Sequence, residues 1–485
     1  MTKIYDVDIL NRYRALMDGN DAVSGVSYFI AAYPSYAIHE TPDDPQPPIS
    51  EISFVAKCSA PLTITVYDEP GQKGNSETHT YNGKGIDEVF NPTIDVVSFS
   101  IDKSSADALQ EFTIGSGVTN IDDYAFSGCT NMLDITIPDS VSGIGSESFR
   151  DCVSMLNLTV GVNITSISKG AFMHTPGLTS ITVAEGNTVY DSRNDCNGVV
   201  DTKTKTLIIG CQNSIIDETL NYVGEYAFYE CTSLTSVTWP QGVMLYGDYI
   251  FEGCDNVKVI NTNEGEFCPS FPSVTDVIYG DDVTYLGDYV NWGEYCPLLS
   301  SITFGSEFRA EYQSSAFGYC QNLARIVVDE NNPYVDSRNN CNALIRKHDE
   351  YSEDKNILLL ACKNTIIPND IEHIDNQAFK NITGITNLTI PDSVTTIRDA
   401  AFSDMQNLME ITFGTGLTSL GGYVISDTSV SKITCKAITA PTLNYTFGEF
   451  SVTNGTLYIP NGSDESYQTW LEALPEGWTI QHITE

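Results

Sequence analysis

Basic residues are scarce in this chain: 24 Lys and Arg stand against 64 Asp and Glu, which gives a formal net charge of −40 over 485 residues. So few cations cannot neutralise a phosphate backbone, which argues against nucleic acid as a partner. Anionic membrane surfaces are disfavoured for the same reason. Two interpretations of the acidic excess stay open: solubility through self-repulsion, or a surface that attracts cations and basic partners.

Long apolar runs are missing as well. The longest uncharged stretch near the start, residues 22–38, is interrupted by serine, glycine and proline, and no segment has the apolar length of a membrane helix. The basic, apolar and small-residue succession of a signal peptide is not found either. We therefore expect no membrane insertion and no Sec-dependent export.

The chain also lacks the patterns of catalytic and metal-binding sites. Its six histidines are far apart, and the sequence contains no HExxH pair, nucleophile elbow, phosphate-binding loop or dinucleotide fingerprint in the required context. The stretch DSRNDCNG superficially resembles a calcium loop but lacks its ligand spacing. We predict a protein that is not an enzyme and has no cofactor and no metal site, with weak Ca²⁺ binding by the acidic surface left open.

Thirteen cysteines are present, but their placement does not suggest the disulfide framework of a small secreted domain. Five of them stand three residues after a recurrent Phe. Stacked repeats would put these five in one column, where a free thiol behaves as a small buried hydrophobe. The five are Cys129, Cys152, Cys231, Cys254 and Cys320.

A repeated phrase that closes on Ala-Phe or a near variant dominates the sequence, and neighbouring copies commonly stand 23 residues apart. Such a period predicts a solenoid, whose units bury their apolar face only by stacking. An alternating phrase such as MLDITIP (132–138) adds a strand to each repeat, with Leu133, Ile135 and Ile137 on its inner side. The predicted fold class is an α+β solenoid with a strand and a short helical turn per 23-residue repeat. The copies are VTNIDDYAF (118–126), VSGIGSESF (141–149), ITSISKGAF (164–172), LNYVGEYAF (220–228), VMLYGDYIF (243–251), RAEYQSSAF (309–317), IEHIDNQAF (371–379) and VTTIRDAAF (394–402), and two degenerate copies lose the ring, VTYLGDYVN (283–291) and LTSLGGYVI (417–425).

Two similar inserts, residues 187–211 and 332–362, interrupt the repeats. In each, two apolar strands flank a polar turn, which predicts a hairpin. Folding the first insert about its turn puts Val199 opposite Ile208. The same folding brings cysteines face to face, so either disulfides or thiols in an apolar layer are expected there: Cys196 with Cys211, and Cys341 with Cys362.

The N-terminal part is organised differently from the repeats. Residues 1–40 combine a helical apolar pattern with an aromatic stretch, and we interpret them as an anchoring segment that docks on the solenoid end or on another subunit. A stiff proline-rich linker follows at 41–48. Residues 49–110 read as a small β domain that caps the open end of the stack.

The phrases NMLDITIPDSVSGIGSESFRDC (131–152) and LTIPDSVTTIRDAAF (388–402) resemble the BspA-like leucine-rich repeats almost residue for residue. The resemblance covers residues 111–435, and residues 436–485 are similar to the closing module common in that family. It implies a leucine-rich-repeat superhelix used for protein or glycan recognition, often in adhesion at bacterial surfaces and also on phage virions. It brings no catalytic residues.

The region 206–308 is the most suggestive for binding, with one basic residue, Lys258, among many acidic and aromatic ones. Acidic, aromatic surfaces suit cationic or carbohydrate ligands. Phe228, Phe251 and Trp239 fall at core positions of the repeat. The predicted exposed, ligand-binding residues are Tyr246, Tyr285, Tyr289 and Trp292.

The sequence thus predicts a recognition or structural protein that binds a protein or glycan receptor. We expect it on the surface of a bacteriophage virion, with the N-terminal segment docked on another structural protein. The alternative is an adhesin on a bacterial cell surface.

Overall fold

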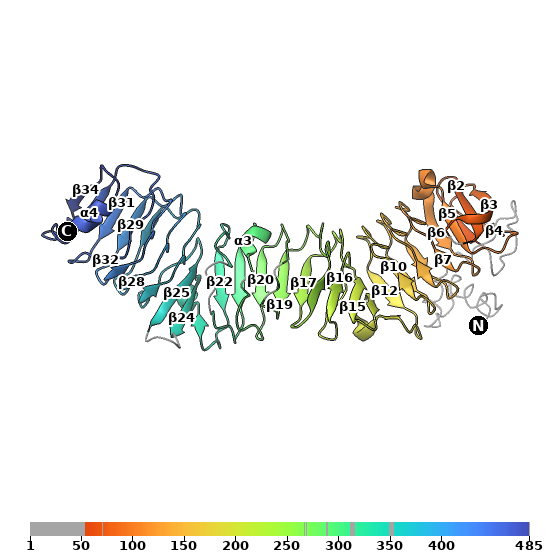
Figure 1. Ribbon diagram of the computed structural model, residues 1–485, viewed down its shortest axis with the longest axis horizontal. Coiled ribbons are helices and arrows are strands. Elements are labelled where there is room, and N and C mark those ends of the chain that lie inside the picture. The colour runs from red at the N-terminus through yellow and green to blue at the C-terminus, as the bar shows by residue number, and fades with distance from the viewer. Residues whose placement is uncertain are drawn as a thin grey trace, which may run out of the picture. The chain divides into compact units, whose positions relative to one another are not determined.

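The computed structural model describes residues 54–69, 71–265, 267, 269–287, 290–310, 316–348 and 354–484. The predicted anchoring segment 1–40 and linker 41–48 lie outside the described residues. The chain divides into two compact units, residues 1–192 and 193–485. Each unit is described by itself below, and Figure 1 labels the elements.

The first unit begins with two small antiparallel sheets and continues as a solenoid with two parallel sheets (Figure 1). Phe54, Phe99 and Phe112 pack between the antiparallel sheets and form their core. The antiparallel strands are β1 (Phe54–Cys58), β2 (Leu62–Glu69), β3 (Lys73–Tyr81), β4 (Asp87–Phe90), β5 (Ser98–Ile101) and β6 (Leu109–Thr113), with the 3-10 turn η2 (Lys103–Ala108) before β6. The solenoid strands are β7 (Asn120–Ile121), β8 (Asp134–Thr136), β9 (Gly143–Ile144), β10 (Asn157–Val160), β11 (Ser166–Ile167), β12 (Ser180–Val183) and β13 (Tyr190–Asp191).

The second unit is a longer solenoid of the same kind. One of its faces carries β14 (Val199–Asp201), β15 (Thr206–Ile209), β16 (Tyr222–Gly224), β18 (Met244–Tyr246), β23 (Val335–Asp336), β24 (Ala343–His348), β25 (Lys355–Ala361), β26 (His373–Ile374), β28 (Thr396–Ile397), β30 (Ser419–Leu420) and β32 (Thr442–Leu443). The other carries β17 (Ser236–Trp239), β19 (Val259–Thr262), β20 (Asp276–Tyr279), β21 (Ser301–Phe304), β22 (Arg325–Val328), β27 (Asn387–Thr389), β29 (Glu410–Phe413), β31 (Lys432–Cys435), β33 (Thr456–Ile459) and β34 (Thr479–His482). Short helical elements are η3 (Arg193–Asp195), α3 (Trp292–Tyr295), η4 (Arg338–Asn340) and α4 (Gln468–Ala473).

The strand formed by each copy of the alternating phrase pairs in parallel with the corresponding strands of the neighbouring repeats. Ile135, Leu158 and Ile181 are direct partners on β8, β10 and β12, and all three are buried. Side chains alternate across a strand, so Asp134 and Thr136 face outward beside them. Leu133, predicted to point inward, precedes the strand and is 43% exposed, so that part of the prediction is wrong.

The predicted helical turn around Ala-Phe is also wrong, and the solenoid is built from strands and turns. Tyr124 (φ 61°) and Gly128 (φ 83°) flank Phe126, and Ala400 (φ 52°) and Asp404 (φ 61°) flank Phe402. A right-handed helix cannot contain such residues, because positive φ reverses its winding. The same two positions are left-handed in six further turns: Glu147 and Asp151, Gly170 and His174, Tyr226 and Glu230, Tyr249 and Gly253, Gln377 and Asn381, and Tyr423 and Asp427.

In this conformation every second backbone N–H of the turn points along the solenoid, towards the next turn. The N–H groups of Ala400, Phe402 and Asp404 donate to the carbonyls of Gly422, Val424 and Ser426 in the next turn, each at 2.9 Å. The amide of Ser403 donates locally, to the carbonyl of Ala400. Each turn is therefore joined to the next by its own ladder, in addition to the strands. Inside it the Phe rings stack, with centroids 4.9 Å apart between Phe126 and Phe149.

The inserts form hairpins that join the sheet, because β15 pairs in parallel with β16 and β25 with β26. β24 and β25 pair antiparallel, and the turns on either side of them remain neighbours: Asn381 donates to the carbonyl of Gly318, and Thr383 to that of Gln321 at 3.3 Å. β14 and β15 pair likewise, but Val199 faces Ile209 instead of Ile208, because a bulge follows Val199. No helix in the described part of the chain is long and apolar enough to span a membrane.

Replacing Ala400 by glycine tests the turn conformation. Ala400→Gly removes the cost of holding a Cβ at φ 52° and is expected to raise the free energy of unfolding by about 1 kcal/mol. Ala401→Gly is the control: this neighbour is fully buried, and its replacement is expected to cost about 1–2 kcal/mol. Urea unfolding of both variants gives the comparison, and equal losses in the two would refute the left-handed turn.

Candidate functional site

Five tyrosines gather on β16, β18 and the turns that follow these strands, and we call them the tyrosine cluster: Tyr222, Tyr226, Tyr229, Tyr246 and Tyr249. Tyr226 and Tyr249 stack nearly parallel, with ring centroids 5.4 Å apart and an interplanar angle of 10°. Tyr222 meets Tyr246 at 5.4 Å and 55°. Tyr246 is 63% exposed and Tyr249 50% exposed.

A slip of one residue in strand register brings Tyr246 to the surface. Strands on this face of the second unit normally pair 23 residues apart, as His373 does with Thr396, whereas Tyr222 pairs with Met244, only 22 residues away. In the repeated phrase Tyr246 occupies the position of the buried Ile121. A one-residue slip exchanges the two faces of a strand, so Tyr246 instead lies opposite Gly224 on the outer side.

Gly247 absorbs the extra residue. The amide of Phe228 donates to the carbonyl of Ile250, so the normal register returns at the next turn. Between these points Gly247 has φ 101°, and a Cβ built on it would lie 2.7 Å from the Cβ of Glu225. Only glycine fits both the dihedral angle and the space. The bulge confines the slip to β18.

Acidic side chains border the cluster. Glu225 and Asp248 stand one residue before Tyr226 and Tyr249, and Glu252 follows in the same turn as Tyr249. Asp248 and Glu252 are exposed. Lys258, the one basic residue in 206–308, precedes β19 in the other sheet, where its backbone bonds Thr235 and Thr275. Both the aromatic and the acidic character expected of this region thus occur at one place.

The structure places three of the four residues predicted as exposed and ligand-binding. Tyr246 and Tyr285 are exposed as predicted, Tyr285 to 54%, and binding by either stays a prediction. Tyr289 lies outside the described residues. Trp292 is fully buried, so the prediction that it is exposed is wrong.

Trp292 is buried because its side chain takes the place of the repeat Phe in the degenerate copy 283–291, which has Asn291 at the Phe position. Its amide donates to the carbonyl of Ala316, the residue before Phe317, just as Phe228 donates to the residue before Phe251. Its indole Nε1 donates to the hydroxyl of Tyr279 at 2.6 Å. The ring enters the turn column one residue late. Trp239, Phe228 and Phe251 are buried as predicted.

The sequence pointed to Tyr246 but missed Tyr222, Tyr226, Tyr229 and Tyr249. The last three stand in YAFYE and DYIF, where the Phe marks the core and its neighbours are turn residues. Reading each phrase for residues two before and one after the Phe would have found them. The slip at β18 has no such signal apart from the glycine at 247.

The insert cysteines are thiols in the structure. Cys196 and Cys211 are both buried and not joined, and Cys362 donates to the carbonyl of Asn342 at 3.3 Å instead of bonding Cys341. The five column cysteines are buried thiols, as predicted. Burial raises the pKa of Cys129 to about 12 and that of Cys231 to about 11. Thiols held in this form are poor nucleophiles and metal ligands.

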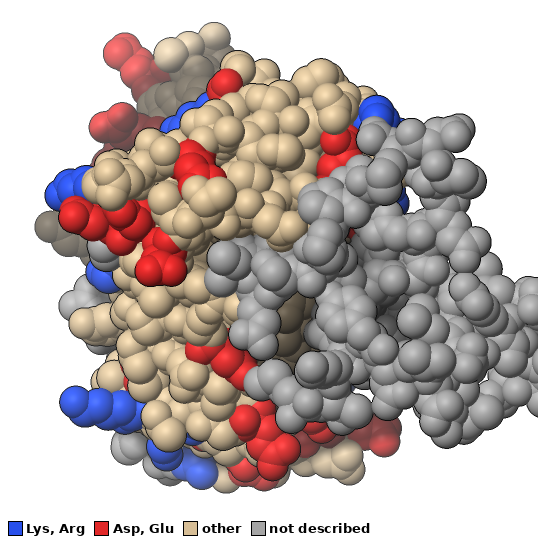
Figure 2. Space-filling model, turned by 90° about the vertical axis from the view of Figure 1, so that its right-hand side faces the viewer, with Lys and Arg blue, Asp and Glu red and all other residues tan. Residues whose placement is uncertain are grey.

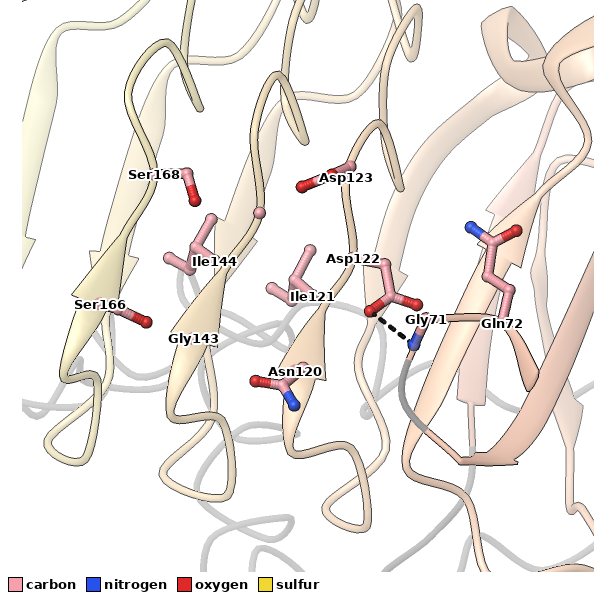
Figure 3. Close-up of a pocket in the computed structure, with 11 residues that line it drawn as sticks. Gly71, Gln72, Asn120, Ile121, Asp122, Asp123, Gly143, Ile144, Ser166 and Ser168 are labelled. Carbon is pink, nitrogen blue, oxygen red and sulfur yellow. Dashed lines mark hydrogen bonds between the residues drawn. The ribbon is translucent and has the colours of Figure 1, made fainter. Parts of the chain in front are cut away.

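A polar hollow of about 390 Å³ lies over β7, β9 and β11 in the first unit (Figure 3). Asn120 and Ser166 flank Gly143, whose missing side chain leaves the gap between them. At its rim Asp122 accepts a hydrogen bond from the amide of Gly71 at 3.3 Å. Its floor is small and hydrophilic, without an aromatic ring among the lining residues, which makes it a weaker candidate than the tyrosine cluster.

No group of three or more His, Cys, Asp or Glu that could hold a metal ion occurs within the described ranges. At the end of the first unit that carries the small β domain, the visible acidic and basic side chains lie scattered among neutral ones (Figure 2). The tyrosine cluster therefore remains the best-formed candidate for contact with a partner.

The fold and this surface define a repeat solenoid with an exposed aromatic patch. The chain belongs to the family described as BspA type leucine rich repeat region, whose model matches six copies over residues 102–196, 209–323, 267–348 and 360–461. This confirms the resemblance seen in the sequence. No curated protein matches the chain.

Several solved structures are similar at low identity. A leucine rich cell surface protein from Faecalibacterium prausnitzii is 17% identical, with 76% of this chain and 84% of that chain covered and a TM-score of 0.27. A leucine-rich repeat protein from Bacteroides ovatus is 18% identical, with 87% and 98% covered and a TM-score of 0.34. One from Eubacterium ventriosum is 15% identical, with 71% and 95% covered and a TM-score of 0.26.

Gly247→Ala is expected to destabilise the protein more than Gly242→Ala. Both glycines have positive φ, 101° and 80°, but Gly242 has open space where a Cβ would stand. The control therefore carries only the dihedral cost of about 1 kcal/mol, and the Gly247 variant adds a clash with Glu225. Urea midpoints measure both. A Gly247 variant no worse than the control would contradict the bulge.

The buried thiols predict alkaline destabilisation. The folded chain holds the protons of Cys129 and Cys254, each with its pKa raised to about 12, more tightly than the unfolded chain does. The stability they contribute is full below about pH 9 and is lost as the pH rises towards 12. Urea midpoints from pH 7 upward test this. Cys129→Ala with Cys254→Ala should flatten the decline, and an unchanged slope would assign it to other groups.

Proposed function

We propose that this protein is a non-enzymatic recognition protein whose solenoid binds a macromolecular partner, a protein or a glycan, through the tyrosine cluster. The observation that carries the proposal is the exposure of Tyr246 by the register slip at β18. The slip gives up the burial of an aromatic ring, which a regular repeat would keep. A residue that departs in this way from the pattern of its repeat is expected at sites where function requires it.

The composition of the cluster supports the same proposal. Tyrosine supplies a large, rigid contact area with a polar tip, and such residues concentrate at binding surfaces. Met244, which is 55% exposed and lies two residues before Tyr246 on the same face of β18, extends the apolar surface. Contiguous exposed apolar groups bordered by polar ones are typical of interaction sites.

Two settings suit such a surface. The sequence predicts display on a bacteriophage virion, and the alternative is display on a bacterial cell, as the resemblance to BspA-like repeats implies. We keep both as proposals. Antibody labelling of purified particles and of intact cells separates them, since each setting predicts signal on one sample and background on the other.

A binding screen tests the proposed function. The full chain is presented to arrayed glycans and surface proteins, together with the variant Tyr246→Ser/Tyr249→Ser. We expect a partner retained by the wild type to bind this variant at least about tenfold more weakly, because two exposed aromatic contacts are removed. The control is Tyr423→Ser/Tyr445→Ser, which removes another exposed, stacked tyrosine pair. Equal losses in both variants, or no partner at all, would refute the proposal.

A further inference from the structure

We propose, building on the function proposed above, that the tyrosine cluster takes an arginine- or lysine-rich segment of a partner protein. The proposal rests on two features of the described residues: a turn position that is covered by a cation elsewhere in the chain, and the acidic border of the cluster.

The chain itself shows how this turn position binds a cation. Tyr124 stands two residues before Phe126, as Tyr249 stands two before Phe251, and Lys103 lies over the Tyr124 ring with its Nζ 4.7 Å from the centroid. The described part of the chain places no Lys or Arg over Tyr249 or Tyr246. A cation over a tyrosine face is attracted by the ring quadrupole. A partner would therefore supply at Tyr249 the cation that Lys103 supplies at Tyr124.

Arginine suits these rings particularly well. The guanidinium of Arg309 already stacks over the ring of Tyr334, 4.7 Å from its centroid. Tyr249 is stacked against Tyr226 on one face only and keeps half of its surface exposed, so its other face is available to a planar cation. A guanidinium can stack on a ring and bond a neighbouring carboxylate at the same time.

The acidic border selects a basic partner over a glycan. Asp248 and Glu252 are exposed beside the rings, and the basic side chains nearest on this sheet, Lys203 and Lys205, lie at the hairpin turn before β15, two strands away from β18. Neutral sugars gain only hydrogen bonds from their hydroxyls to the carboxylates, and acidic sugars are repelled by them. A positively charged segment gains both cation–π and ionic contacts.

Peptide binding to the full chain tests the proposal. The probe is a fluorescent peptide of alternating arginine and serine, compared with the same peptide carrying glutamate for arginine, by anisotropy at low and physiological salt. We expect only the arginine peptide to bind, and salt to weaken it. Tyr246→Ser/Tyr249→Ser and Asp248→Asn/Glu252→Gln should each lose at least about tenfold in affinity, whereas Tyr246→Phe/Tyr249→Phe should retain it.

Matched controls separate a specific site from general attraction to an acidic protein. Glu472→Gln/Glu476→Gln removes two exposed charges elsewhere, and Tyr423→Ser/Tyr445→Ser removes a distant ring pair. Less than about twofold change in either supports the proposal, and losses equal to those of the cluster variants overturn it. Failure of the arginine peptide alongside a screened partner that needs Tyr246 and Tyr249 would overturn the basic segment and leave the proposed function standing.

Discussion

The hydrogen bonds that run from each turn to the next are the constraint on which this fold depends. Because two left-handed residues flank the turn's central position, every second amide points along the stack. The ladder forms only when successive turns are in register. Most of these turns repeat every 23 residues, and the ladder also joins Trp292 to Ala316 across a longer turn. Ring stacking of Phe126, Phe149 and Phe172 follows from the same registration. The packing of the core and the hydrogen bonds of the backbone therefore depend on each other.

The tyrosine cluster is a local departure that this constraint tolerates. The ladder holds at Phe228 and Phe251 while the strand between them slips, with Gly247 taking up the difference. An aromatic ring thus leaves the core without disturbing either neighbouring turn. The solenoid supplies rigidity, and the irregular strand supplies the distinctive surface. Carboxylates in the same turns make the surface around the tyrosine cluster negatively charged.

Much of the architecture could be predicted from the sequence, because burial leaves a periodic signal. The family, the buried cysteine column and the core rings Phe228 and Trp239 follow from it. The turn conformation could not, since Tyr124 and Ala400 give no hint of positive φ. Trp292 misled because its ring enters the column one residue late. At the candidate site, composition led to Tyr246. The register of β18 against β16, which exposes Tyr246, depends on how the two strands pair, and no local sequence pattern predicts that pairing.

The hairpin insert at β24 and β25 shows how little the stack depends on chain continuity. Thr383 bonds a residue 62 positions earlier, across a junction where regular turns bond at 23, as Gly384 does with Asn407. Closing the longer loop costs only about 0.9 kcal/mol more, because closure entropy grows with the logarithm of length. The tip of such a hairpin can therefore lengthen at little entropic cost, whereas its strands are constrained, because β25 pairs with β26 and Ile345 and Leu358 are buried in the core.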